Sequence, residues 1–488
     1  MLAKKYLVTL LVVLLVLSSA GFCLASDANN RTKMAKRVEP AVVMVQTTFE
    51  ANVEVVYPYL DENKLNDTLN NIIEQVMQGI IPADESAMWK ALADEIRTKP
   101  LEFLQKSDQK KVIQNGYRVV GSGFIITSDG YVVTNAHVVA PDEELLKQYL
   151  SRPILEESVN SFMVEVGEGA VRIPSDTRNY VLQAITNMVI TYYMENMKVL
   201  NLNKTVNIGM GVQVPGAPLL QKGIKAEVIQ AGGVVPNKDV AVLKMAGQNS
   251  LPTVPVGESN LLTIGNKIYI MGYPGAATFH PLLSESSQAQ PSLTEGIISA
   301  QKTMEGGWSV FQTNADITQG NSGGPVFNDK GEVIGLATFG SVDMATGQEI
   351  AGMNFVVPIS VVKEFLDRGN VKPSESLVAK TYKEAMDLYD KGYYKKSLKK
   401  FQEVAALCPG HPYVQNFVAD STKAIREGKD KSVSGWVLFG ISVAAVMVIL
   451  VVVVMRKQKV VQGATVNGSA DGEGIEKDKV KIEKSDTE

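Results

Sequence analysis

Three short segments hold side chains that could together break a bond by nucleophilic attack. His137 follows the apolar run 130–134, Asp239 precedes Val-Ala-Val-Leu, and Ser322 lies within Gly-Asn-Ser-Gly-Gly-Pro. A serine hydroxyl becomes a nucleophile when a neutral imidazole accepts its proton. A carboxylate on the other ring nitrogen fixes the tautomer and stabilises the imidazolium. These residue types, in the chain order His, Asp, Ser, predict acyl transfer with Ser322 as nucleophile, His137 as base and Asp239 as its partner.

The glycines around the serine have a chemical purpose of their own. They allow a tight turn whose backbone N–H groups converge on the oxyanion that forms during attack. We expect this oxyanion hole to be built from the backbone of Gly320, Asn321 and Ser322. Each of the three segments alone is a common loop or turn, but all three in this order, each beside a strand pattern, favour a catalytic set.

Composition narrows the chemistry further. The chain has 488 residues, and of its three histidines His280 and His411 each precede a proline in a loop-like context. His137 is therefore the candidate base. The two cysteines leave little for a disulfide framework or a structural zinc site, and we expect no metal and no cofactor. A net charge of −4 gives no electrostatic reason to expect a nucleic-acid partner.

The elements that must position these residues are mainly short strands. From residue 38 to about 366, β-branched and apolar runs alternate with turn signals such as Asp129-Gly130, which predicts a β-barrel or sandwich. The blocks 58–115 and 141–203 interrupt this pattern with apolar residues at helical spacing. We expect helical insertions there, acting either as lids or regulatory loops or as plain structural additions.

The region 374–428 has a helical pattern throughout. Residues 382–409 carry apolar and small side chains at offsets that resemble one tetratricopeptide repeat, with Gly392 in the turn and Pro409 at the end. One repeat cannot bury its apolar face alone. We therefore expect a small helical hairpin that residues 412–426, the preceding domain or another subunit must cover. A role in binding a protein partner is an open alternative.

Two apolar segments flank this region. Residues 1–26 have a basic start and a long uncharged run, which predicts a signal peptide, with an uncleaved signal anchor as the alternative. Residues 435–455 are 21 residues without a charge, long enough for one transmembrane helix. Basic residues follow it, so we expect a disordered cytoplasmic tail at 456–488 and an extracytoplasmic location for everything between the two segments.

The segment 38–366 resembles the HtrA/DegP family of trypsin-like serine proteases. Beyond the three segments above, the similarity rests on Val256–Ser259, Met271–Gly275, Thr294–Ser299 and Asn354–Pro358. The resemblance implies a pair of six-stranded β-barrels with the active site between them. It also implies polypeptide substrates and a homo-oligomer, often a trimer.

Departures from the family pattern are informative. No PDZ domain follows the protease segment, because 374–428 is helical in pattern. His137 and Asp239 are 102 residues apart (239 − 137), a separation lengthened by the 141–203 insertion. Asn321 stands where digestive trypsin-like enzymes have an aspartate that pairs with a new N-terminus. Activation by zymogen cleavage is therefore not expected, and ordering of the loop around 273–293 is the expected switch.

Asp316 is the candidate for the base of the substrate pocket. It lies six residues before Ser322, the position that sets side-chain preference in trypsin-like enzymes. A carboxylate at the base of the pocket would favour cleavage after Lys or Arg. The alternative is that Asp316 simply faces solvent.

Taken together, the sequence predicts a membrane-tethered, extracytoplasmic serine endopeptidase that cleaves unfolded or exposed polypeptides in protein quality control. Two other functions are compatible with the same features. The helical hairpin could make the protein a scaffold or adaptor, or the enzyme could be a signalling protease with one dedicated membrane substrate.

Overall fold

The computed structural model describes residues 30–170, 172–211, 223–284, 290–342 and 349–431. The predicted signal segment 1–26, the predicted transmembrane helix 435–455 and the tail 456–488 lie outside the described residues. Among the helices described between residues 30 and 431, none has both the length and the apolar character needed to cross a bilayer.

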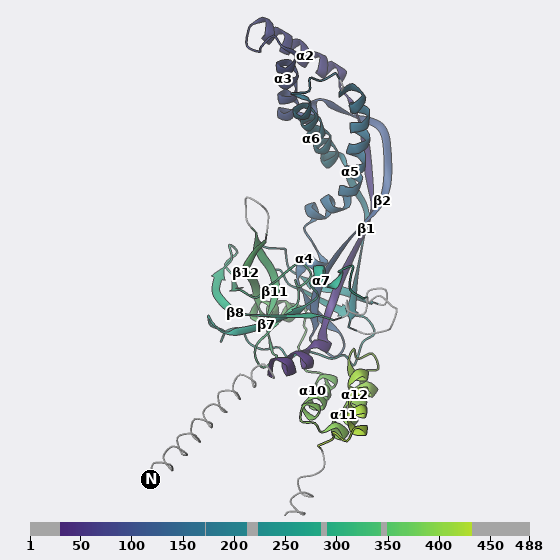
Figure 1. The fold of residues 1–488 in the computed structure, drawn as a ribbon, viewed down its shortest axis with the longest axis vertical. Coiled ribbons are helices and arrows are strands. Elements are labelled where there is room, and N and C mark those ends of the chain that lie inside the picture. The colour runs from purple at the N-terminus through teal and green to yellow at the C-terminus, as the bar shows by residue number, and fades with distance from the viewer. Residues whose placement is uncertain (1–29, 171, 212–222, 285–289, 343–348, 432–488) are drawn as a thin grey trace, which may run out of the picture.

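Twelve strands form two closed antiparallel barrels, as predicted (Figure 1). The first has the strand order β1-β2-β3-β6-β5-β4 and the second the order β10-β11-β12-β9-β8-β7. The first barrel contains β1 Val42–Leu60, β2 Leu104–Ile125, β3 Tyr131–Thr134, β4 Lys198–Met210, β5 Ile224–Ala231 and β6 Ala241–Met245. The second contains β7 Lys267–Gly272, β8 Ser292–Thr303, β9 Ser309–Thr313, β10 Pro325–Phe327, β11 Val333–Val342 and β12 Glu349–Pro358.

One hydrophobic core extends across both barrels, and the second barrel has a further buried cluster of its own. Val43 and Phe124 of the first barrel belong to the same buried cluster as Met271 and Leu336 of the second. Val42–Val45 of β1 are buried on both faces of the strand, since each of the four residues is at most 1% exposed. Because apolar burial is the main favourable term in folding, this shared core stabilises the position of one barrel against the other.

Strands β1, β2 and β4 continue far beyond the first barrel and carry four helices. We call this part the arm, residues 49–117 and 143–204. It contains the outer parts of the three strands with α2 Glu62–Met77, α3 Glu85–Thr98, the short 3₁₀ helix Pro100–Glu102, α5 Glu143–Ala170 and α6 Arg178–Asn196. In Figure 1 the arm projects from the first barrel as a separate lobe.

The expectation of purely helical insertions was wrong in part. Residues 104–115 and 198–203 are strand, and β1 pairs with both, as Val53 does with Ile113 and Val199. The helices bury their apolar faces against this three-stranded sheet and against one another. A single core joins Ile72 and Leu92 of the first insertion to Met188 of the second. The two insertions are therefore one structural unit.

The C-terminal region is helical, as predicted, and of the three possible covers for the hairpin the structure shows the helix within residues 412–426. After α9 Ile359–Arg368, the C-terminal bundle comprises α10 Leu377–Asp390, α11 Tyr394–Leu407 and α12 Val414–Arg426. Helix α12 contributes Val414 to the core that Tyr382 and Phe401 form between α10 and α11. The apolar face between α10 and α11 is thus covered by α12.

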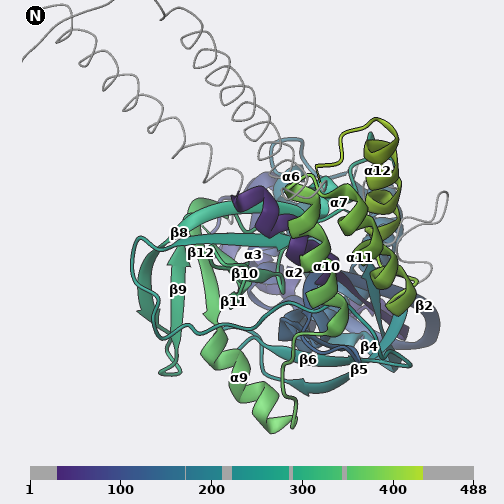
Figure 2. The ribbon, with the colours of Figure 1, turned by 90° about the horizontal axis from the view of Figure 1, so that it is seen from below.

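Polar contacts at α10 help to attach the C-terminal bundle to the rest of the molecule. The backbone N–H of Ser376 donates to Thr253 Oγ1 at 2.8 Å, and Arg37 forms an ion pair with Asp387. Arg37 lies in the N-terminal helix, residues 30–38. Figures 1 and 2 place this helix and the bundle on the side of the barrels away from the arm. The first and last described residues therefore lie on one side of the molecule.

The buried core of the arm gives a stability prediction. Tyr193 of α6 is 1% exposed, so Tyr193→Ala leaves a cavity and should destabilise the arm by about 3–5 kcal/mol. Hydrogen exchange should become faster in α2, α3, α5 and α6 and stay unchanged in the second barrel. Met77→Ala is the control, because Met77 is 82% exposed and its loss should change stability by less than about 0.5 kcal/mol. Equal exchange in both variants would contradict a shared arm core.

A buried histidine in the C-terminal bundle gives a pH prediction. His411 is 4% exposed and stacks on Tyr382 with ring centroids 4.5 Å apart. Its Nδ1 accepts from the Tyr413 N–H at 3.3 Å, while its Nε2 has no partner among the described residues. Burial penalises the charged imidazolium and lowers the pKa of His411 to about 3.

The unfolded chain takes up a proton at this histidine below a pKa of about 6.5, whereas the folded bundle does not. The free energy of unfolding of the bundle is therefore highest above pH 6.5. It decreases by about 2 kcal/mol as the pH falls from 7 to 5. Hydrogen exchange of α10–α12 at both pH values should show this loss, and His411→Gln should remove it. The exposed His280→Gln serves as the control. The same pH dependence in His411→Gln and wild type would contradict the assignment.

Candidate active site

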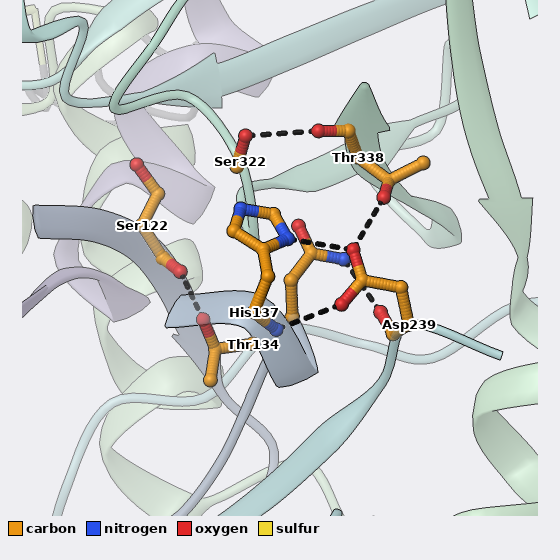
Figure 3. Close-up of polar contacts among 7 residues, drawn as sticks. Ser122, Thr134, His137, Asp239, Ser322 and Thr338 are labelled. Carbon is orange, nitrogen blue, oxygen red and sulfur yellow. Dashed lines mark hydrogen bonds and ion pairs between the residues drawn. The ribbon is translucent and has the colours of Figure 1, made fainter. Parts of the chain in front are cut away.

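The three predicted catalytic residues come together between the two barrels. His137 lies on the short helix α4 Ala136–Val139, directly after β3. Asp239 precedes β6 of the same barrel, and Ser322 lies in the turn before β10 of the second barrel. In Figure 3 the imidazole ring of His137 lies between Asp239 and Ser322.

The carboxylate of Asp239 orients the histidine through two contacts. His137 Nδ1 lies 2.7 Å from Asp239 Oδ2, and the backbone N–H of His137 donates to Asp239 Oδ1 at 2.9 Å. Thr338 Oγ1 also donates to Oδ2, at 2.8 Å, and Asp239 is fully buried. Because an ionised carboxylate only accepts hydrogen bonds, Nδ1 carries the proton and Nε2 is left as the acceptor. This is the tautomer that a general base needs.

The nucleophile hydroxyl is directed at a backbone carbonyl. Ser322 Oγ donates to the carbonyl oxygen of Thr338 at 2.9 Å (Figure 3). No hydrogen bond joins Ser322 to His137 among the contacts of the described residues. Catalytic hydrogen bonds in free enzymes are often long and form only with substrate bound. The hydroxyl must leave the Thr338 carbonyl before His137 can accept its proton.

The turn before Ser322 offers two backbone donors for an oxyanion. The N–H of Asn321 donates to the Thr318 carbonyl at 2.9 Å, so it is already engaged. Among the described residues, no acceptor is found for the N–H groups of Gly320 and Ser322. These two groups are therefore available to serve as oxyanion donors, whereas the N–H of Asn321, the third predicted donor, is bonded to Thr318.

The backbone of the turn can be adopted only by glycine at position 320. Gly320 has φ +101°, and a Cβ there would lie 2.3 Å from the Tyr273 carbonyl oxygen. The Gln319 carbonyl accepts from the Gly275 N–H at 2.7 Å. Since the peptide unit is planar and trans, the N–H of Gly320 points away from that carbonyl. The segment 273–275 thus sets the direction of one oxyanion donor. Residues 285–289 of the expected switch loop lie outside the described residues.

Two residues of the site have roles that the sequence did not reveal. Thr338, on β11, contacts both the nucleophile and the carboxylate. Ser122, on β2, donates from its hydroxyl to the Gly320 carbonyl at 2.7 Å and accepts from the Tyr273 N–H at 2.8 Å. The flanking glycines are the available signal for Ser122, because a Cβ at Gly121 would lie 2.9 Å from the Ser322 carbonyl oxygen.

Asp316, the candidate for the base of the substrate pocket, is exposed. Its backbone carbonyl accepts from Thr294 Oγ1 at 3.1 Å. Within the described ranges, no cluster of three or more His, Cys, Asp or Glu side chains could hold a metal ion.

Comparison with known families agrees with this geometry. Residues 208–336 match the family model described as a trypsin-like peptidase domain. The matched range includes Asp239 and Ser322, whereas His137 precedes it and is separated from it by the second insertion.

The chain is also similar to several serine proteases. It is 37% identical over 132 residues to the probable periplasmic serine endoprotease DegP-like of Pseudomonas putida, covering 26% of this chain and 24% of that protein. It is 32% identical over 148 residues to the mitochondrial serine protease HTRA2 of Bos taurus (29% and 28%) and 29% identical over 134 residues to the serine endoprotease DegS of Escherichia coli (27% and 34%). The chain thus spans about a quarter to a third of the length of these relatives.

The buried carboxylate gives a test of the site itself. Asp239→Asn keeps the shape of the side chain but stabilises the wrong tautomer of His137, so reaction of Ser322 with a fluorophosphonate probe should slow by roughly 10⁴-fold. Asp108→Asn, at an exposed position of β2, is the matched control and should label at the wild-type rate. Unchanged labelling of Asp239→Asn would show that His137 does not depend on this carboxylate.

Proposed function

We propose that the protein is a serine endopeptidase of the HtrA type that cleaves peptide bonds through an acyl-enzyme on Ser322. The observation that carries the proposal is the contact of His137 Nδ1 with the fully buried Asp239, beside Ser322 and the available N–H groups of Gly320 and Ser322. The similarity of part of the chain to serine endoproteases supports it.

The mechanism follows from this geometry. Ser322 Oγ attacks the substrate carbonyl carbon while its proton passes to His137 Nε2. The negative charge that develops on the substrate oxygen is stabilised by the N–H groups of Gly320 and Ser322. His137 then gives the proton to the leaving amine as the C–N bond breaks. A water molecule next attacks the acyl carbonyl carbon while His137 accepts its proton. The ester bond to Ser322 Oγ breaks as His137 returns that proton to Oγ. Asp239 holds the ring and stabilises the imidazolium throughout.

The proposed setting is extracytoplasmic and membrane-tethered, with unfolded or exposed polypeptides as substrates. One relative is described as periplasmic, which supports an extracytoplasmic site of action. The described part begins four residues after the predicted segment 1–26 (30 − 26) and ends four residues before 435–455 (435 − 431). Both of its ends lie on the side away from the arm (Figures 1 and 2). That common side is what two anchors in one bilayer would need.

Oligomerisation as a trimer and binding of a protein partner by the tetratricopeptide-like part of the bundle stay predictions. The scaffold alternative is less favoured. Binding a partner through the bundle would not require a buried Asp239 that orients His137 beside Ser322. A signalling protease with one dedicated membrane substrate would use the same site.

The experiment that tests the proposal compares wild type with Ser322→Ala on casein, using the full-length protein in detergent. Wild type should cleave casein and react with a fluorophosphonate probe. Ser322→Ala should lose both, with a cleavage rate below about 10⁻³ of wild type. Equal casein cleavage by the two proteins would overturn the role of Ser322. The absence of both cleavage and labelling in wild type would overturn the endopeptidase function.

The exposure of Asp316 gives a prediction on specificity. An exposed carboxylate is screened by water and salt, so it should contribute little to selecting a basic side chain. In a peptide library, Asp316→Asn should change the ratio of cleavage after Lys or Arg to cleavage after Val or Ala by less than about threefold. A wild-type preference for Lys or Arg that disappears in Asp316→Asn would show that Asp316 forms the base of the pocket.

A further inference from the structure

Besides its contacts with β11, the turn that carries the oxyanion donors is held by three hydrogen bonds from other segments. The Gly275 N–H donates to the Gln319 carbonyl at 2.7 Å, and the Ser122 N–H donates to the Ser322 carbonyl at 2.8 Å. In the third, the Ser122 hydroxyl donates to the Gly320 carbonyl at 2.7 Å. Two of these three contacts come from one residue of the first barrel.

Such anchoring matters because Gly320 does not hold its own conformation. At φ +101° it uses backbone freedom that only glycine has, and the same freedom lets the peptide units on either side rotate. A rotation of the Gln319–Gly320 unit would turn the Gly320 N–H away from the oxyanion position. The Gly320–Asn321 unit joins the two donors, so a rotation of that unit would change the position of Asn321 and of the Ser322 N–H that follows it. The Gln319 carbonyl therefore sets the direction of the first donor, and the Gly320 carbonyl affects the position of the second relative to the first.

We propose that the Ser122 hydroxyl is a positioning residue for the reaction, which holds the Gly320 carbonyl so that the oxyanion donors stay aligned. This inference rests on the proposed endopeptidase function. Ser122 touches no reacting atom in the structure, and it acts through Gly320. Neither the family comparison nor the catalytic set assigns it a role.

The surroundings of Ser122 explain why a hydroxyl is needed there. Ser122 is fully buried, and its oxygen both donates to Gly320 and accepts from the Tyr273 N–H at 2.8 Å. A Cβ at Gly272 would lie 2.7 Å from this oxygen, so the space around it is closed. An alanine would leave one buried carbonyl and one buried N–H without their partner, each at a desolvation cost.

The same hydroxyl connects the oxyanion turn to the start of the loop 273–293. Tyr273 begins this loop, is fully buried, and its own hydroxyl donates to the Val42 carbonyl at 3.3 Å. Ser122 therefore joins β2 of the first barrel, the end of β7 in the second barrel and the oxyanion turn. A displacement of β2 or of the end of β7 would therefore change the position of the hydroxyl that holds the Gly320 carbonyl.

The test is steady-state kinetics of Ser122→Ala with a peptide substrate, with wild type and Ser322→Ala in the same assay. Removing one oxyanion donor costs about 10²–10³ in kcat, so loss of its support should lower kcat by about 10- to 100-fold with KM within about threefold. Affinity for a peptide boronate, whose tetrahedral adduct uses the oxyanion hole, should fall in parallel with kcat. Affinity for the same peptide as a simple amide should not change.

Ser259→Ala is the matched control. Ser259 is also a buried serine, and its hydroxyl also both donates and accepts, to Ser360 Oγ at 3.1 Å and from the Ser360 N–H at 3.2 Å. Its loss should leave kcat and boronate affinity at wild-type values. If Ser122→Ala does not fold, Ser122→Cys keeps a weak donor and should have an intermediate kcat.

The outcomes separate this inference from the function on which it rests. Wild-type kcat and boronate affinity in folded Ser122→Ala, or in Ser122→Cys where alanine does not fold, overturn the positioning role alone. Equal losses in Ser122→Ala and Ser259→Ala would also overturn it, because they would reflect stability only. Activity that survives in Ser322→Ala, or is absent in wild type, overturns the endopeptidase function and this inference with it.

Discussion

A single buried carboxylate organises this molecule. Asp239 is removed from water between the two barrels, and a buried charge persists only where donors replace its hydration. Those donors come from both sides: His137 belongs to the first barrel and Thr338 to the second. Because His137 and Thr338 both bond to this carboxylate, Asp239 fixes His137 relative to β11. The Thr338 carbonyl on the same strand accepts from Ser322 Oγ. The shared hydrophobic core gives this arrangement its rigidity, but the core does not specify which residues face one another.

The sequence could predict features that depend on neighbouring residues, but not contacts between residues that are far apart in the chain. The barrels were predictable because each strand and each turn is a local pattern, and His137, Asp239 and Ser322 each lie in a short motif. Thr338 and Ser122 were not predictable from one sequence, since their contacts join residues 99 and 198 positions apart. The sequence predicted the Asn321 N–H as a third oxyanion donor, because only the fold shows that this N–H closes a turn with Thr318.

The arm shows the same limit in a different way. Its helices were evident from apolar spacing, but the strand part of residues 104–115 is mostly exposed and polar and gave no alternating pattern. Nor could the sequence show that two insertions on either side of β3 form a common core. Arg97 of the first insertion lies 3.6 Å from the ring centroid of Tyr180 of the second, and Tyr180 also contacts Asp94. The pattern of apolar residues within one segment does not show which distant segment it packs against.

The continuity of β1 and β2 has a mechanical consequence. Their pairing runs without a register shift from Val42↔Phe124 in the barrel to Val56↔Lys110 in the arm. A hinge requires a few residues that are free to change φ and ψ, and an unbroken ladder provides none without breaking hydrogen bonds. At about 3.3 Å per residue, the 19 residues of β1 extend roughly 60 Å. The β1–β2 ladder is therefore a stiff connection between the first barrel and the arm, and the register shift at the root of the arm is confined to the pairing of β1 with β4, between Glu50 and Asn52.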